Sequence, residues 1–173
     1  MNIKFLITQI ITSIRIICSP ILFYTIIEEL KLYAYLLFVL IIITDVIDGY
    51  IARRYSVSTN FGAYYDATVD FAAIMFSFSA FAINSIYPYW LLIIFLFSFV
   101  FFILTSKTNN LIYDPFGKYY GAIIFCVIGI TLIYTKHHML QLIPIILIII
   151  AMISFISRIY QIKKIKMKDF NKP

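Results

Sequence analysis

Four aspartates stand in two closely spaced pairs within one short, otherwise apolar stretch of this sequence. Asp45 and Asp48 are three residues apart, and Asp66 and Asp70 are four residues apart. Either spacing puts both members of a pair on one face of an α-helix. A carboxylate in membrane-grade sequence is costly unless a positive charge compensates it. The two pairs therefore predict a site for divalent metal, with oxygen ligands that suit Mg²⁺ or Mn²⁺.

The helices that must position these pairs are predicted from the apolar composition. Hydrophobic residues make up 63% of the 173-residue chain and charged residues 13%, which is more apolar surface than a soluble domain of this size can bury. A membrane-spanning helix needs roughly 20 apolar residues, so the predicted fold is an all-α integral membrane bundle of about six transmembrane helices. The expected spans are residues 5–27, 32–52, 61–83, 88–106, 118–135 and 139–160. They form one membrane domain, 1–160, followed by a basic tail, 161–173.

Charge predicts the orientation of this bundle. With six spans, only Lys31 and Lys136 of the 14 Lys and Arg residues fall on the side away from the acidic pairs. By the positive-inside tendency, the acidic pairs face the cytoplasm of a cell-membrane protein. The basic residues are expected to contact anionic lipid headgroups. Nucleic acid is not an expected partner, because the basic tail belongs to a membrane protein.

The two acidic pairs are expected to face each other. A short polar segment, 53–60, joins the second and third spans, which predicts antiparallel neighbours. Arg53 and Arg54 could neutralise only two of the four carboxylates, so a purely structural ion-pair network is disfavoured. Small residues beside the acids allow either close helix packing or room for a ligand. These residues are Gly49, Ala52, Gly62 and Ala63.

Metal ions held by carboxylates at a membrane surface suit chemistry on phosphate. The ions would neutralise phosphoryl oxygens, while one carboxylate could accept the proton of an attacking alcohol. The chain has no glycine-rich phosphate loop and no HExxH sequence, so the aspartates are its candidate catalytic residues.

The string from Asp45 to Asp70 resembles the signature of the CDP-alcohol phosphatidyltransferase family, D-x2-D-G-x2-A-R-x8-G-x3-D-x3-D. All eight specified positions match. The segment with Thr12, Arg15 and Pro20 is also similar to the family's first helix. The resemblance implies transfer of a phosphatidyl group, or its archaeal equivalent, from a CDP-linked lipid to a small alcohol with release of CMP. It also favours a homodimer.

The resemblance implies a role for each motif residue. Asp45, Asp48 and Asp66 would bind two metal ions, and Asp70 would be both a ligand and the general base for the acceptor hydroxyl. Four further residues would contact the CDP-linked lipid: Gly49, Ala52, Arg53 and Gly62.

The acceptor alcohol is not specified by the motif. Relatives that resemble phosphatidylglycerophosphate synthases often read D-P-x-A-D-K in the third helix, whereas this chain has Ala67 and Phe71 in place of the proline and lysine. Glycerol 3-phosphate is one candidate, and inositol phosphate, serine or another lipid alcohol are alternatives. Basic residues near the expected inner helix ends could bind an acceptor phosphate or simply anchor the helices at the interface. These are Lys118, Arg15, Lys107 and Arg158.

Among these four, Lys118 is favoured because Pro115 and Gly117 predict a shaped turn that leads into the fifth helix.

Two other classes of protein carry clustered aspartates in membranes. A prenyltransferase would use two separated acidic motifs on a longer bundle. A divalent-cation transporter would need acidic residues near mid-membrane on several helices. The remaining acids instead fall in expected loops or in the tail: Glu28, Glu29, Asp114 and Asp169.

Overall fold

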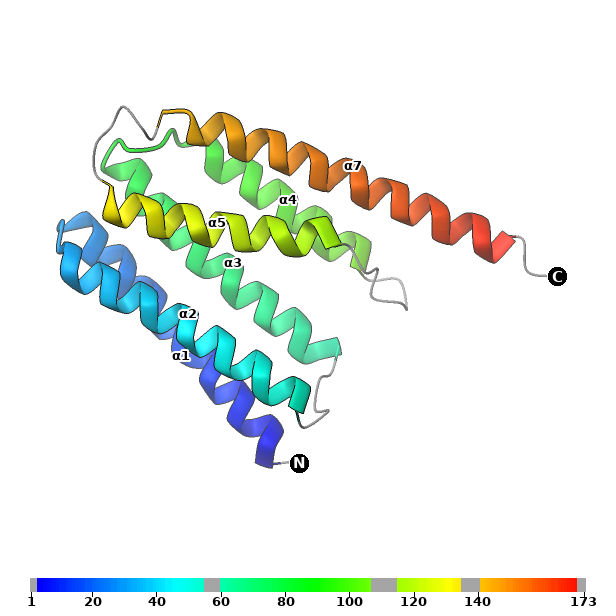
Figure 1. Ribbon diagram of the computed structural model, residues 1–173, viewed down its shortest axis with the longest axis horizontal. Helices are drawn as coiled ribbons and strands as arrows, with labels where there is room; N and C mark the ends of the chain where they lie inside the picture. The colour runs from blue at the N-terminus through cyan, green and yellow to red at the C-terminus, as the bar shows by residue number, and fades with distance from the viewer. Residues whose placement is uncertain (1–2, 55–59, 107–114, 135–140, 171–173) are drawn as a thin grey trace. The chain divides into compact units, whose positions relative to one another are not determined.

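The protein is helical throughout the part of the chain that the computed structural model describes, which is residues 3–54, 60–106, 115–134 and 141–170. No strand occurs within these ranges, which confirms the predicted all-α class. In chain order the helices are α1 (Ile3–Ile27), α2 (Lys31–Arg54), α3 (Asn60–Ile83), α4 (Trp90–Ser106), α5 (Pro115–Ile133) and α7 (Ile143–Phe170), as Figure 1 shows.

Four of these helices are long and apolar enough to cross a membrane, which supports the predicted membrane bundle. The candidate spans are Ile10–Ile27, Lys31–Ile51, Tyr64–Ile83 and Ile143–Lys163. The other two apolar helices, Trp90–Ser106 and Tyr119–Ile133, are shorter.

Two helix boundaries differ from the sequence prediction. Helix α5 begins at Pro115, so the turn expected at Pro115 and Gly117 is the first turn of the helix. Proline is well tolerated at this position. Helix α7 continues to Phe170, so the residues expected to form a solvated tail are helical as far as 170. Residues 161–170 contain neither glycine nor proline, and four of the ten are lysine, which helices accommodate well.

The chain divides into two compact units. The first comprises Met1–Tyr87 and Ile128–Thr135, and the second comprises Pro88–Val127 and Lys136–Pro173. In the second unit α4 packs against α7, with the rings of Phe101 and Phe155 4.3 Å apart. The first unit contains all four motif aspartates.

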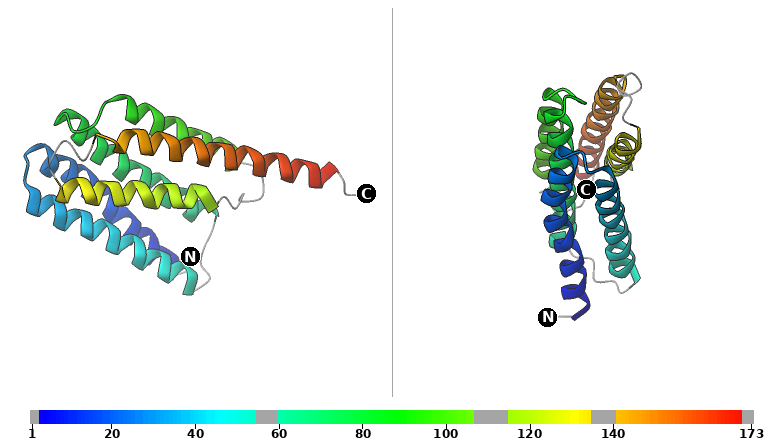
Figure 2. Two further views of the ribbon diagram at one scale, coloured as in Figure 1. Left: turned by 45° about the horizontal axis from the view of Figure 1, so that its top comes forward. Right: turned by 90° about the vertical axis from the view of Figure 1, so that its left-hand side faces the viewer.

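Helix α1 is the central element of the first unit, because it packs against both α2 and α3. Figure 2 shows α1 and α2 side by side in both of its views. The buried positions of α1 recur every three or four residues, as expected for one face of a helix. They are Thr12, Arg15, Cys18, Ser19, Leu22, Thr25 and Ile26.

The prediction that the two acidic helices are direct neighbours is wrong in one respect. Among the described residues, α2 and α3 contact each other far less than either contacts α1. The covalent link between α2 and α3 is short, but α1 offers a face with small and hydroxyl-bearing residues, such as Ser19, against which both can pack.

The ends of α1 and α3 that lie away from the aspartates are tied together. Each helix is closed by a residue with a positive φ, Glu29 at 54° and Ser85 at 58°. In this type of helix ending, an amide beyond the turn bonds back to a free carbonyl. The side-chain amide of Asn84 also donates to the carbonyl of Ile26 at 2.9 Å. Helices α1 and α3 therefore run in the same direction. The contact at this end fixes how the two helices are aligned along their axes, and so which residues of α1 lie level with the aspartates of α3.

The last turns of α5 complete the first unit. A Cβ atom added to Gly129 would lie 3.0 Å from the ring of Phe38, so glycine lets α5 approach α2 closely. The hydroxyls of Tyr87 and Thr131, both buried, are 2.7 Å apart and share a hydrogen bond.

Candidate active site

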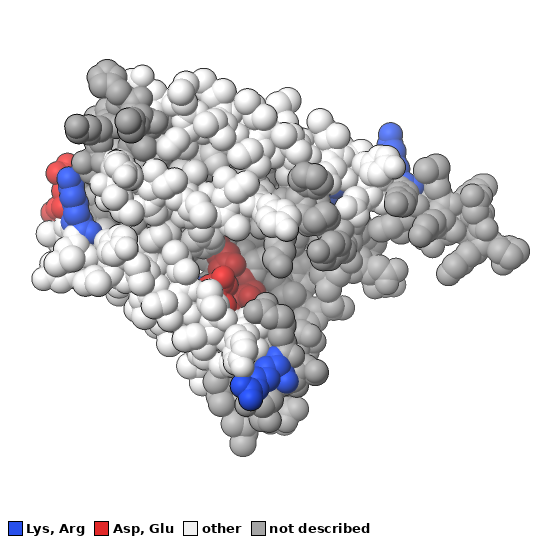
Figure 3. Space-filling view, viewed as in Figure 1, with Lys and Arg blue, Asp and Glu red and all other residues white. Residues whose placement is uncertain are grey.

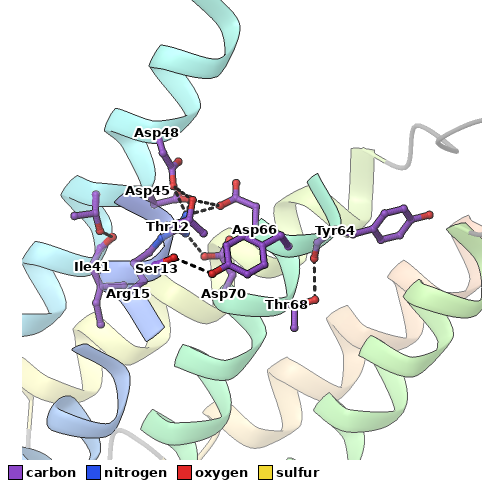
Figure 4. Close-up of polar contacts among 12 residues, drawn as sticks. Thr12, Ser13, Arg15, Ile41, Asp45, Asp48, Tyr64, Asp66, Thr68 and Asp70 are labelled. Carbon is purple, nitrogen blue, oxygen red and sulfur yellow. Dashed lines mark hydrogen bonds and ion pairs between the residues drawn. The ribbon is translucent and has the colours of Figure 1, made fainter. Parts of the chain in front are cut away.

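Arg15 of α1 lies at the centre of the four aspartates, as Figure 4 shows. Its Nη1 donates to Asp45 Oδ1 at 2.8 Å and also to Asp70 Oδ1. Its Nη2 donates to Asp48 Oδ2 and Asp66 Oδ1. Each terminal nitrogen therefore joins one carboxylate of α2 to one carboxylate of α3. The prediction that the two acidic pairs meet is confirmed, and their meeting point is a side chain of a third helix.

The cluster is closed on one side and open on the other. The Arg15 side chain is completely buried and that of Asp48 is only 4% exposed. Asp45 and Asp66 are 49% and 38% exposed, and Asp70 is 30% exposed. Figure 3 shows acidic side chains at the surface, with mostly uncharged atoms around them among those described. A ligand can therefore reach three of the carboxylates, whereas Arg15 and Asp48 form the floor of the site.

Hydroxyl groups of α1 add to the site. Thr12 Oγ1 lies 3.0 Å from Asp48 Oδ2 and 3.3 Å from Asp66 Oδ1, so its proton is directed between the two carboxylates. Ser13 Oγ lies 2.9 Å from the hydroxyl of Tyr65, the residue before Asp66. One turn of α1 thus holds the start of α3 in register with α2.

The donor set fits a divalent metal ion. One oxygen from each of Asp45, Asp48 and Asp66 can be chosen so that all three lie within 4.8 Å of one another. Asp48 Oδ1 is buried and has no hydrogen-bond partner among the described residues, which is costly for a carboxylate oxygen unless a cation satisfies it. In the described part of the chain, the ion pairs of these four carboxylates all go to one guanidinium, which carries a single positive charge. All ligands are oxygens, which Mg²⁺ and Mn²⁺ prefer.

The model of the CDP-alcohol phosphatidyltransferase family matches residues 5–158, most of the chain. The chain belongs to this family. It is therefore a transferase that moves a phosphatidyl group from a CDP-alcohol, and an integral membrane protein of phospholipid biosynthesis. Enzymes of the family use a divalent metal ion, in agreement with the donor set. No curated protein and no solved structure matches the chain.

Within the part of the chain that the structure describes, the basic side chain among the aspartates of this phosphatidyltransferase is Arg15. Arg54 is exposed, and its Nη1 donates to the hydroxyl of Tyr50 at 2.6 Å. The sequence analysis gave Arg15 only as a possible acceptor ligand, and the side chain of Arg53 lies outside the described residues. A signal was present in the sequence, because an arginine inside an apolar span requires a partner. Thr12 stands three residues before Arg15, on the same face of the helix.

The residues predicted to contact the CDP-linked lipid are described only in part. Gly49 follows Asp48 on α2, and Gly62 lies one turn before Asp66 on α3; both are partly exposed. The side chains of Ala52 and Arg53, at the end of α2, lie outside the described residues.

The four predicted acceptor ligands are described only in part. Arg15 is in the aspartate cluster of the first unit, and Arg158 is on α7 in the second unit. The Arg158 guanidinium is buried, donates to the hydroxyls of Thr105 and Ser106 and to the carbonyl of Phe102, and stacks 4.6 Å from the Phe102 ring. The Lys118 side chain and the whole of Lys107 lie outside the described residues.

Proposed function

We propose that this enzyme transfers the phosphatidyl group, or its archaeal equivalent, of a CDP-linked lipid to glycerol 3-phosphate and releases CMP. The observation that carries the proposal is the convergence of Asp45, Asp48, Asp66 and Asp70 from two helices on one partly open site. Family membership supplies the donor class and the type of transfer.

The proposed step forms one bond and breaks another. The acceptor hydroxyl oxygen bonds to the phosphorus of the phosphatidyl group, and the bond from that phosphorus to the CMP oxygen breaks. The leaving oxygen keeps the electron pair, so that CMP departs as a phosphate monoester. The hydroxyl proton passes to the carboxylate of Asp70, acting as the general base.

The position of Asp70 supports this role. Its carboxylate is 30% exposed, so an acceptor hydroxyl can reach it, yet it lies in the same cluster as the three other aspartates. A base must lie within hydrogen-bond reach of the proton that it accepts. An exposed edge beside the proposed metal ligands satisfies this requirement for an alcohol that enters from water.

In this proposal Asp45, Asp48 and Asp66, together with Asp70, hold two Mg²⁺ or Mn²⁺ ions. When bound, such ions neutralise phosphoryl oxygens and stabilise the leaving oxygen. The motif residues nearest these ligands would contact the nucleotide part of the donor: Gly49, Ala52, Arg53 and Gly62. Support comes from the partial exposure of Gly49 and Gly62, which leaves room beside the carboxylates.

An acceptor that carries a phosphate needs a cationic partner, and the basic residues proposed for this role are Lys107, Lys118 and Arg158. Inositol phosphate, serine or another lipid alcohol would be the acceptor if these residues serve only as anchors.

The proposal places the site on the cytoplasmic side of the cell membrane. The excess of Lys and Arg on the side of the aspartates supports this orientation. CMP would then be released into the cytoplasm. A homodimer within the bilayer, and a single membrane domain over residues 1–160, are parts of the same proposal.

The acceptor is tested with purified enzyme in lipid nanodiscs, CDP-diacylglycerol, Mg²⁺ and one alcohol at a time, with the lipid product identified by mass spectrometry. The proposal expects phosphatidylglycerol phosphate from glycerol 3-phosphate. It also expects Arg158→Gln to raise the KM for this acceptor more than it lowers kcat. A lipid product formed only with serine, or only with an inositol phosphate, would disprove the choice of acceptor.

A further inference from the structure

We propose that Arg15 is a resident cation that holds the aspartate site together without metal and competes with divalent metal for the same carboxylates. This inference rests on the metal site proposed above. Arg15 is a positioning residue in this account, because it acts on the aspartates and not on the reacting atoms.

The first support is the placement of the guanidinium between the two acidic helices. Nη1 joins Asp45 to Asp70, and Nη2 joins Asp48 to Asp66. Helices α2 and α3 have little direct contact among the described residues. Arg15 therefore supplies the polar connection that brings their carboxylates to one point.

The second support is that the guanidinium occupies the oxygens that a metal would need. Oδ2 of Asp48 and Oδ1 of Asp66 both accept from Nη2, and these two residues belong to the trio whose oxygens lie within 4.8 Å of one another. A metal ion bound by that trio must share these carboxylates with Arg15 or displace it.

The third support is that the arrangement with arginine alone is incomplete. Asp48 Oδ1 and Arg15 Nε are both buried, and neither has a hydrogen-bond partner within the described ranges. Buried polar atoms normally have partners, and one guanidinium offsets only one of four carboxylate charges. Arg15 therefore connects the four carboxylates but does not neutralise all of their charge or pair all of the buried polar atoms. This favours the binding of a second cation.

Arg15 cannot leave the site easily. Its side chain has no exposed surface, and its backbone carbonyl accepts a hydrogen bond from Ser19 Oγ at 2.6 Å within α1. A positive charge retained beside the carboxylates opposes the binding of a divalent cation. Removal of that charge should therefore increase the affinity for metal. It should also lower the stability of the protein without metal.

The test compares the full-length wild type, Arg15→Gln and Arg15→Lys in lipid nanodiscs. Mn²⁺ binding is measured by electron paramagnetic resonance, and the Tm is measured with EDTA and with saturating Mn²⁺. For Arg15→Gln we expect a lower Tm in EDTA, a Kd for Mn²⁺ that falls about tenfold, and a larger rise in Tm on metal addition. Arg15→Lys keeps the charge but has one nitrogen in place of two, so its metal affinity should lie between those of the other two proteins.

Two control variants separate this role from general effects. Arg54→Gln removes an exposed arginine of α2 and should leave the Tm and the Mn²⁺ affinity unchanged, because an exposed charge is screened. Arg158→Gln removes a buried arginine of the second unit and should lower the Tm equally with and without Mn²⁺.

The outcomes distinguish this inference from the proposed function. A wild type that binds no Mn²⁺ would overturn both. A wild type that binds Mn²⁺, with Arg15→Gln binding it no more tightly, would overturn only the role of Arg15. An Arg15→Gln protein that folds only when Mn²⁺ is present would support that role. If Arg15→Gln does not fold at all, Arg15→Lys decides: tighter binding than wild type supports the inference, and equal or weaker binding contradicts it.

Discussion

The Nη1 atom of Arg15 donates a hydrogen bond to Oδ1 of Asp70, the carboxylate proposed to act as the general base. The contact links the centre of α1 to α3 across 55 residues of sequence. A carboxylate paired with a guanidinium is held in one orientation. The same contact must loosen before Asp70 can accept a proton from an alcohol, so the binding of metal or substrate and the release of Asp70 are expected to be coupled.

Replacement of the proposed base should separate binding from chemistry. Asp70→Asn keeps the size of the side chain and removes its basicity, so transfer should fall by more than about hundredfold. Binding of the CDP-linked lipid, measured by ligand-induced change in Tm, should be largely retained. Glu28→Gln is the matched control, since Glu28 is an exposed acid at the opposite end of α1, and it should transfer at the wild-type rate. Wild-type turnover in Asp70→Asn would remove Asp70 from the base role.

Metal removal should abolish transfer reversibly. Three carboxylate oxygens within 4.8 Å of one another suit hard cations, so EDTA should stop CMP release and Mg²⁺ or Mn²⁺ should restore it. Asp48→Asn, which removes the most buried of the carboxylates, should raise the metal concentration needed for half-maximal activity. Undiminished CMP release in EDTA after dialysis would contradict a metal-dependent site.

The hydroxyl of Thr12 should contribute to the site although it belongs to neither acidic pair. Thr12→Val preserves shape and removes the hydrogen bond directed at Asp48 and Asp66, which is worth about 1–2 kcal/mol for a charged acceptor. Metal affinity or kcat/KM should fall about tenfold. In the control Thr68→Val, the lost hydroxyl donates only to the Tyr64 carbonyl of its own helix, and little change is expected. Equal effects of the two substitutions would argue against a role for Thr12.

The last turns of α5 should contribute to stability but not to the active site. Tyr87→Phe removes a buried hydrogen bond to Thr131 and should destabilise the protein by about 1 kcal/mol, seen as a lower Tm with unchanged metal affinity. Tyr89→Phe, at an exposed position nearby, should have no effect. A change in metal affinity in Tyr87→Phe would show that this contact also shapes the site.

The sequence was sufficient to predict the helices and the meeting of the acidic pairs. Both follow from local rules: apolar length predicts a span, and spacings of three or four residues place Asp45 with Asp48 and Asp66 with Asp70 on one helical face. The cost of four carboxylates in apolar sequence predicted a compensating cation. The identity of a basic residue at the site depends on the packing of α1 against α2 and α3.

The position of Arg15 could not be deduced in the same way. Its contacts join residues 30 to 55 positions apart, and they depend on α1 packing against both acidic helices. Arg53 and Arg54 are near Asp48 in sequence, and they were considered able to neutralise only two of the four carboxylates. Tertiary packing selected Arg15, whose side chain is fully enclosed. The expected basic tail is helical as far as residue 170, because its residue types favour helix.

The most direct measurement of the central claim is CMP release from CDP-diacylglycerol by the purified enzyme, with Mg²⁺ or Mn²⁺ and a panel of alcohols. The account predicts one CMP for each phosphatidyl group transferred, with release that depends on both metal and acceptor and is lost in Asp70→Asn. No CMP with any alcohol, together with uptake of divalent cations into proteoliposomes that contain the protein, would contradict the account.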